Sequence, residues 1–318
     1  MNKTKDKFRQ FCLKNHQIPL FLRDWWLDHT AGINNWDVVV LEKDGHIVSF
    51  MPFAIKKVGV FTAIGMPLLT PFLGVWVAYP ENQNKTAKLS MEKKYFSQLI
   101  QQLPKFDKFS AQLDPNITNW LPFYWEGYKQ TTCYTYVIEN LSDTNHVYEN
   151  FKGNIKGDIS KAKGAIQICE SNDIEHFYLI CSKTFSRQKK QIPFSFKFIS
   201  TLFKGIQEYN AGKILTSKDK EGNVHAAALI VWDKQRAYYL LGGGDPQLRN
   251  SGATSLLLWE AIKLAATVSN QFDFEGSMIE PIEQFFRGFG GTQKPYFQLT
   301  KYNSKTIELA DHLRNKLK

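Results

Sequence analysis

The chain has 318 residues, 43% of them hydrophobic and 22% charged, which is enough apolar material for two domains and too little charge for a disordered chain. The net charge of +10 favours an anionic partner, and the excess is spread over both halves of the sequence. The N-terminus has no apolar core typical of a signal peptide, and no uncharged apolar run is long enough to span a bilayer. We expect a cytoplasmic protein.

The four cysteines are widely spaced and form no metal-binding motif with histidine, so we expect reduced thiols and no metal site. The most apolar stretch, residues 59–80, is interrupted by glycines and prolines. We expect it to form buried strands and turns.

Aromatic residues are concentrated in two segments of the first half. Residues 24–36 contain three tryptophans, and Trp36 among them is a candidate for lining an acceptor groove. Tyr124, in the aromatic segment 119–128, is a candidate substrate contact for the same reason. The alternative for both is an ordinary place in the core.

Two similar hairpin patterns lie about 177 residues apart. Residues 36–55 and residues 212–232 each read as strand, turn and strand, with Asp-Gly and Glu-Gly at the respective turns. We interpret this as a duplication of one α/β unit. The predicted fold is α/β with mixed α+β sheets, with an N-terminal domain at 1–140 on the acceptor side and a C-terminal, donor-binding domain at 141–318.

In the second half, residues 173–188 and 195–209 are predicted to form helices, because apolar residues recur there at helical spacing. Arg187 and Gln188 lie at the end of the first of these helices and could hold an anion or a substrate. The alternative is a solvated helix end, where cations are favoured by the helix dipole.

A glycine-rich segment, residues 238–266, runs from a predicted strand into a predicted helix. The dinucleotide pattern G-x-G-x-x-G fails at Gln247, and there is no G-K-[ST] of a P-loop. A helix start still offers unpaired amides that favour a phosphate. The predicted cofactor-binding residues are Gly242, Gly243, Gly244, Arg249, Asn250, Ser251, Gly252 and Ala253. The alternative is a tight turn with a solvated arginine.

The motif FDFEGS supplies the candidate general base. Strand alternation places Asp273 and Glu275 on one face, close enough to raise one pKa. The alternative for each is helix capping or an ion pair. Tyr239 could protonate a leaving group or hold a carbonyl, or it could be a core residue. Arg287 is a further candidate beside the glycine-rich segment, and Ser277 is expected to cap a helix.

The C-terminal half resembles the GNAT acyltransferases, whose R-x-x-G-x-[GA] loop cradles the pyrophosphate of acyl-CoA. Arg249 and Gly252 match this loop, whereas Thr254 departs from it. Most of the chain is similar to the FemABX-like branch, in which two GNAT-like units sit in tandem with a cleft between them. The pieces that carry this likeness include NFKGNIKGDISKAKGAIQICE, TFSRQKKQIPFSF and FDFEGSMIEPIEQFFRGFGGTQKPYF.

The resemblance implies an N-acyltransferase that acts without a covalent intermediate or a permanently bound cofactor. The expected reaction moves an acyl or aminoacyl group from acyl-CoA or a similar donor to an amine of a sugar, a peptide or a lipid-linked precursor, as in cell envelope biosynthesis. A lipid-linked acceptor would bring peripheral membrane contact, and no DNA partner is expected. The alternatives are an aminoacyl-tRNA donor, disfavoured by the lack of a long helical arm, and a binding protein without turnover.

Overall fold

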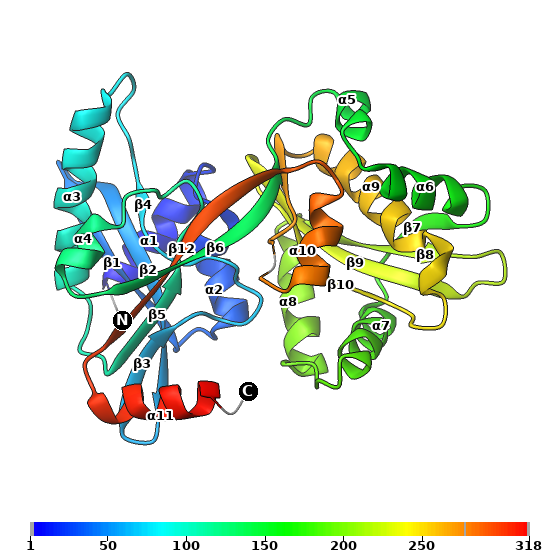
Figure 1. Cartoon of the computed structure of the whole chain (residues 1–318). Helices are drawn as coiled ribbons and strands as arrows, with labels where there is room; N and C mark the ends of the chain where they lie inside the picture. The colour runs from blue at the N-terminus through cyan, green and yellow to red at the C-terminus, as the bar shows by residue number, and fades with distance from the viewer. Residues whose placement is uncertain (1–2, 277, 317–318) are drawn as a thin grey trace. The chain divides into compact units, whose positions relative to one another are not determined.

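The computed structural model describes residues 3–276 and 278–316 and consists of two compact units (Figure 1). Unit 1 comprises Met1–Cys133 and Pro295–Lys318, and unit 2 comprises Tyr134–Lys294. This division differs from the predicted domains 1–140 and 141–318, because the end of the chain returns to pack in the first unit. The sequence alone gives no sign of this return.

The first half of the chain consists of two helices, three antiparallel strands, a helix, a strand, a short helix and a final strand. These are α1 (Lys3–Lys14), α2 (Asp24–Thr30), β1 (Trp36–Lys43), β2 (His46–Val58), β3 (Phe61–Gly65), α3 (Lys85–Gln101), β5 (Lys108–Gln112), α4 (Leu121–Trp125) and β6 (Lys129–Ile138). A 3-10 turn at Leu20–Leu22 and the short strand β4 (Trp76–Val77) lie between them.

The second half repeats this order after α5 (Thr144–Glu149), α6 (Gly153–Ala162) and β7 (Gln167–Ser171). The repeated elements are α7 (Ile174–Arg187), α8 (Phe196–Glu208), β8 (Gly212–Lys218), β9 (Val224–Trp232), β10 (Arg236–Gly244), α9 (Ala253–Ala266), β11 (Gln271–Asp273), α10 (Glu280–Arg287) and β12 (Thr292–Tyr302), followed by α11 (Lys305–Lys316). Ser277 lies outside the described residues, and Ile279 occupies the N-cap of α10.

The strands of the two units follow the same topology. In unit 1, the antiparallel strands β1, β2 and β3 are followed by β5, which pairs parallel to β3 and antiparallel to β12. In unit 2, β8, β9 and β10 are followed by β11, which pairs parallel to β10 and antiparallel to β6. Each unit therefore takes its closing strand from the other half of the chain: β12 closes unit 1 and β6 closes unit 2. The predicted duplication is present as a repeated order of elements in which the last strands are exchanged.

Local sequence explains several of these boundaries. Asp44 and Gly45 both have positive φ, 51° and 78°, as the tight turn between β1 and β2 requires. The carboxylates of Asp143 and Asp173 and the hydroxyl of Ser195 accept amide hydrogen bonds at the starts of α5, α7 and α8. All four cysteines are free thiols.

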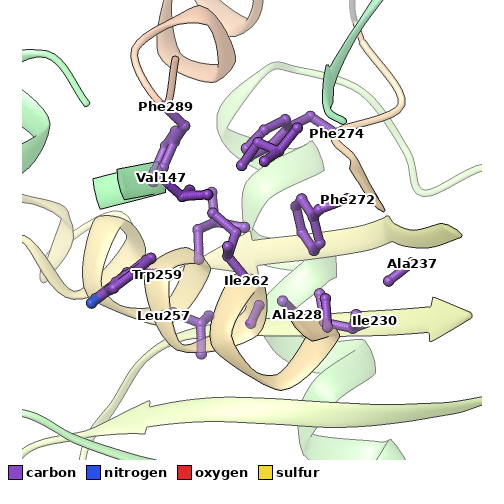
Figure 2. Close-up of a cluster of buried hydrophobic side chains, with 14 of the residues drawn as sticks. Val147, Ala228, Ile230, Ala237, Leu257, Trp259, Ile262, Phe272, Phe274 and Phe289 are labelled. Atoms are coloured by element: carbon purple, nitrogen blue, oxygen red, sulfur yellow. The ribbon is translucent and has the colours of Figure 1, made fainter. Parts of the chain in front are cut away.

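The core of unit 2 lies between α9 and the sheet (Figure 2). Every residue of β9 is buried, and alternate residues such as Ala228 and Ile230 face Leu257 and Ile262 of α9. Helices α7 and α8 pack against the same sheet. Burying each large aliphatic side chain contributes roughly 1.5–3 kcal/mol, so this core fixes β9, β10 and α9 as a rigid frame.

One sequence prediction about unit 1 is wrong in part. Residues 59–80 were expected to be buried, and Ile64, Phe72 and Leu73 are. Val60, however, is 91% exposed, because it lies in the turn between β2 and β3, where no element covers it in the described structure.

A candidate donor site in unit 2

The central strands of unit 2 separate at one end. Strand β10 pairs with β9 from Ala237 to Gly244, but with β11 only from Arg236 to Tyr238. Beyond Asp273 the chain follows β6, and the Phe274 amide donates to the Tyr136 carbonyl at 3.0 Å. Among the described residues, no strand pairs with this side of β10 after Tyr238. An open main-chain edge of this kind can hold a bound molecule.

Glu275 lies where β11 leaves β10. Its φ is +58°, a left-handed conformation that costs a non-glycine residue free energy and is found at functional sites. Its Oε1 atom is buried and has no hydrogen-bond partner in the described part of the chain. Burial, and secondarily the charge of Asp273, raise the pKa of the Glu275 carboxyl well above its usual value. These are the properties of a general base at near-neutral pH.

Asp273 has a different environment. It is 4% exposed and pairs with Arg236, whose Nη1 atom lies 3.3 Å from Oδ2. The hydroxyl of Thr135 and the amide of Glu275 both donate to Oδ1. A carboxylate surrounded by donors is stabilised in its charged form and is a poor base. Of the two predicted carboxylates, the structure makes Glu275 the better candidate and gives Asp273 a structural role.

Tyr239 is placed on β10 beside the opening. Its hydroxyl lies against Gly242, where a methyl group would come within 1.9 Å of it. Its ring packs edge-on against Phe286. Burial, and secondarily the Cys181 thiol, raise the pKa of Tyr239, so the phenol keeps its proton. It can therefore act as a hydrogen-bond donor.

The glycines at the end of β10 have packing roles that the sequence did not indicate. Gly242 makes room for the Tyr239 ring, and a methyl at Gly243 would lie 2.8 Å from the main chain of α7 at Cys181. The Gly244 amide donates to the Thr184 hydroxyl at 3.0 Å. The phosphate-binding site was predicted to include these three glycines. At Gly242 and Gly243, however, the space is occupied by other atoms of the protein.

The start of α9 is partly covered as well. Gly252 has φ +77° and is buried against α6, where a methyl would lie 2.2 Å from the Asp158 carbonyl oxygen. The Ala253 amide donates to the Ser251 hydroxyl at 3.3 Å. The amides of Thr254 and Ser255 have no acceptor among the described residues. The amides available to a phosphate thus lie one or two residues later than predicted.

Arg249 and Asn250 lie on the surface at this loop. Both are exposed, and the Asn250 carbonyl accepts a hydrogen bond from Lys161 of α6. Arg249 has no hydrogen-bond or ion-pair partner within the described chain, so its guanidinium can reach an anion at the start of α9.

A chain of hydrogen bonds that the sequence analysis missed holds this loop. His225 of β9 contacts the Ser251 hydroxyl through Nδ1 at 2.8 Å and the Asp219 carboxylate through Nε2 at 3.1 Å. Hydrogen bonds from Asn223 and then His225 lower the pKa of Asp219. Because the three residues come from a turn, a strand and a loop, no local sequence pattern marks them.

The remaining predicted residues of unit 2 form no hydrogen bonds with this site in the described structure. Arg187 and Gln188 are exposed at the end of α7. Arg287 donates to Glu283 of its own helix at 2.8 Å, and Glu283 also accepts from the Tyr136 hydroxyl. The pKa of Arg287 is raised by this pairing.

The two candidate substrate contacts in unit 1 differ in exposure. Trp36 is 3% exposed, its indole donates to Asp28 at 2.8 Å, and Lys5 lies over its ring, so it is a core residue. Tyr124 is 58% exposed on α4 and packs edge-on against Trp120. Within the described chain, no group of three or more His, Cys, Asp or Glu residues could hold a metal ion, and no helix is long and apolar enough to cross a bilayer.

Residues 150–276 match a family model described as an acetyltransferase (GNAT) domain. The matched segment lies within unit 2 and contains Tyr239, Glu275 and the loop before α9. A comparison with curated proteins found no match to the chain.

Several solved structures share the fold of the whole chain. FemX is 12% identical, with a TM-score of 0.66 over 93% of this chain and 96% of FemX. The C-terminal domain of a putative lysylphosphatidylglycerol synthetase from Agrobacterium fabrum is 10% identical (TM-score 0.59, 98% of this chain and 95% of that chain). L-PGS from Bacillus licheniformis is 12% identical (TM-score 0.55, 99% and 97%).

The chain therefore has the fold of the FemABX-like branch of the GNAT superfamily, with two GNAT-like units in tandem, as its sequence implied. Its strands form a mixed sheet, and the predicted fold class is confirmed. At 10–12% identity the likeness is one of fold.

Proposed function

We propose that the protein is an N-acyltransferase that moves an acyl or aminoacyl group from an activated donor to an amine. The observation that carries this proposal is Glu275: a strained residue, at the point where two central strands separate, with a buried and unpartnered carboxyl oxygen and a raised pKa. Stability alone gives no reason to keep such a group.

In the proposed reaction, the amine nitrogen of the acceptor attacks the carbonyl carbon of the donor and the C–N bond forms. Glu275 accepts the proton that the nitrogen releases. The bond between the carbonyl carbon and the leaving sulfur or oxygen then breaks, and the electron pair leaves with that atom. Glu275 passes the proton to the leaving atom, and Tyr239, whose phenol stays protonated, is the candidate to donate a hydrogen bond to that atom.

The donor carries phosphates in this proposal, and they bind at the start of α9. The amides of Thr254 and Ser255 and the exposed guanidinium of Arg249 supply the positive potential. Acyl-CoA is the first candidate, on the likeness of Arg249 and Gly252 to the GNAT loop. Aminoacyl-tRNA is the second, because one solved structure of similar fold is named as a putative lysylphosphatidylglycerol synthetase and a lysyl group is an aminoacyl group.

Thermal unfolding with acetyl-CoA, free CoA, and charged or uncharged tRNA tests the donor. A ligand at 100 times its Kd adds about 2.7 kcal/mol of stability and raises Tm measurably. Stabilisation by both CoA compounds supports the first donor, and stabilisation by tRNA that falls steeply with salt supports the second.

Arg249→Ala should remove most of that shift, whereas Arg187→Ala, which changes another exposed arginine of unit 2, should leave it intact. No shift with any of these ligands would contradict the donor site. It would leave the third alternative, a binding protein without turnover.

A further inference from the structure

Unit 1 contains a pocket of about 920 Å³ that the proposed reaction does not use. It lies between the β2–β3 hairpin, β5 and α11, and its volume is in the range of small-molecule and lipid sites. Its walls are mainly apolar, with contributions from Ile55, Val58, Phe61, Ile64, Met66 and Ile307.

The charged residues of this pocket are mostly positive. Lys56, Lys57, Lys108 and Arg314 line it together with a single acid, Asp311. Lys108 and Arg314 both pair with Asp311, whereas Lys56 and Lys57 are exposed and have no ion-pair partner in the described structure. An apolar pocket with an excess of three positive charges fits a molecule that has an apolar part and an anionic head.

The whole of unit 1 also carries an excess of positive charge. It carries 21 Lys and Arg against 13 Asp and Glu, a net charge of +8, whereas unit 2 carries 19 against 17, a net charge of +2. A division at residue 140 hides this difference, because it assigns the basic C-terminal segment to the other half.

Exposed aliphatic side chains occur on two of the elements that line the pocket. In the turn of the hairpin, Val58 is 56% exposed and Val60 is 91% exposed, directly after the two free lysines. On α11, Leu309 and Leu313 are 62% and 55% exposed and lie one helical turn apart. Aliphatic side chains in water gain nothing from a soluble anion or a nucleic acid, but they gain free energy by entering a lipid interface.

We propose that the hairpin tip and α11 dock on an anionic lipid bilayer, and that the pocket between them takes the apolar part of one lipid. Lys56 and Lys57 then face the lipid phosphates while Val58 and Val60 enter the interface. The surface is independent of the transfer reaction, since it requires neither Glu275 nor the donor loop. It would also hold unit 1 against a membrane in which a lipid-linked acceptor resides.

Sedimentation with phosphatidylcholine vesicles, prepared with and without phosphatidylglycerol, tests the proposal without any turnover. The intact protein should bind the anionic vesicles and lose much of that binding at high salt. Lys56→Glu with Lys57→Glu should weaken binding by at least about thirtyfold. Val58→Ser with Val60→Ser should weaken it by about tenfold or more, and this loss should persist at high salt.

Matched controls come from exposed residues elsewhere. Lys197→Glu with Lys204→Glu makes the same charge change on α8, and Leu89→Ser with Leu179→Ser removes two exposed aliphatic side chains. Both controls should bind vesicles like the original protein. All variants are at exposed positions, so Tm should change little. Equal binding by the test variants and controls, or no vesicle binding by the intact protein at low salt, would overturn the proposal. Saturable binding of tRNA at this surface, without vesicle binding, would replace it.

Discussion

The amide of Glu275 donates a hydrogen bond to the carboxylate of Asp273 at 2.8 Å, yet the two carboxyl groups have opposite environments. Asp273 is enclosed by Arg236, Thr135 and that amide. Glu275 has a buried oxygen without a donor. The contact fixes the turn in which Glu275 adopts its left-handed conformation, and the negative charge of Asp273 adds to the rise in the Glu275 pKa. One carboxylate thus positions the other and raises its basicity.

Glu275→Gln should lower kcat by roughly 10²- to 10⁴-fold while donor binding is retained, because the variant removes the proton acceptor and keeps the shape. In the original protein, kcat should fall as pH decreases through the raised pKa of Glu275, since protonation inactivates the base. That acidic limb should be absent from the residual rate of the variant. Glu280→Gln, an exposed change on α10, serves as the control.

The same pKa predicts an independent effect on stability. A carboxyl whose pKa is raised by folding favours the native state below its unfolded pKa, near the ordinary 4.5, and that contribution is lost as pH rises through the native pKa. The unfolding free energy of Glu275→Gln, measured in urea at several pH values, should therefore lack this decline and match or exceed that of the original protein at neutral pH. A parallel decline in both proteins would contradict the raised pKa.

Part of the site could be predicted from the sequence. The FDFEGS motif directed attention to Asp273 and Glu275, but strand alternation placed both on one face of a strand, whereas β11 ends at Asp273 and Glu275 lies in a turn. Arg249 and Gly252 were found through the loop pattern. The contacts that distinguish the two acids come from Arg236 and Thr135, which are 37 and 138 residues from Asp273.

The fold, too, could be predicted only where it depends on local sequence. Turns such as Asp44-Gly45 are encoded locally and were found. The exchange of β6 and β12 between the units depends on pairing between strands that are far apart in sequence, which local patterns do not encode. The same limit applies to the glycines of β10, whose roles depend on Tyr239 and on the approach of α7.

Asp273→Asn should destabilise the protein by about 3–5 kcal/mol, because it breaks the buried ion pair with the guanidinium of Arg236, which is only 5% exposed. Urea denaturation measures the change. Asp245→Asn removes a partner of Lys183 in a pair whose lysine is 52% exposed, and it should cost less than about 1 kcal/mol. Similar losses in the two variants would show that Asp273 has no special structural role.

Tyr239→Phe should lower kcat by about 10²-fold and leave donor binding and Tm nearly unchanged, because only a donor hydroxyl beside Gly242 is removed. Steady-state kinetics and a thermal shift with the donor separate these effects. Tyr178→Phe, which loses a hydrogen bond to the Phe194 carbonyl in the same unit, should keep its activity. Full activity of Tyr239→Phe would reduce this residue to a packing role.

Gly252→Ala should disturb both the fold and the donor site. The new methyl would lie 2.2 Å from the Asp158 carbonyl oxygen, and alanine at φ +77° is strained in any case, so we expect a loss of at least about 1–3 kcal/mol. Moving α9 away from α6 would also displace the amides of Thr254 and Ser255, and the thermal shift with the donor should shrink. Gly157→Ala is the matched control, because it lies in α6 with nothing within 4 Å of the new methyl and should stabilise the helix by roughly 0.5–1 kcal/mol. If Gly252→Ala were as stable as Gly157→Ala and gave an undiminished donor shift, the close contact between α6 and α9 would not shape the phosphate site.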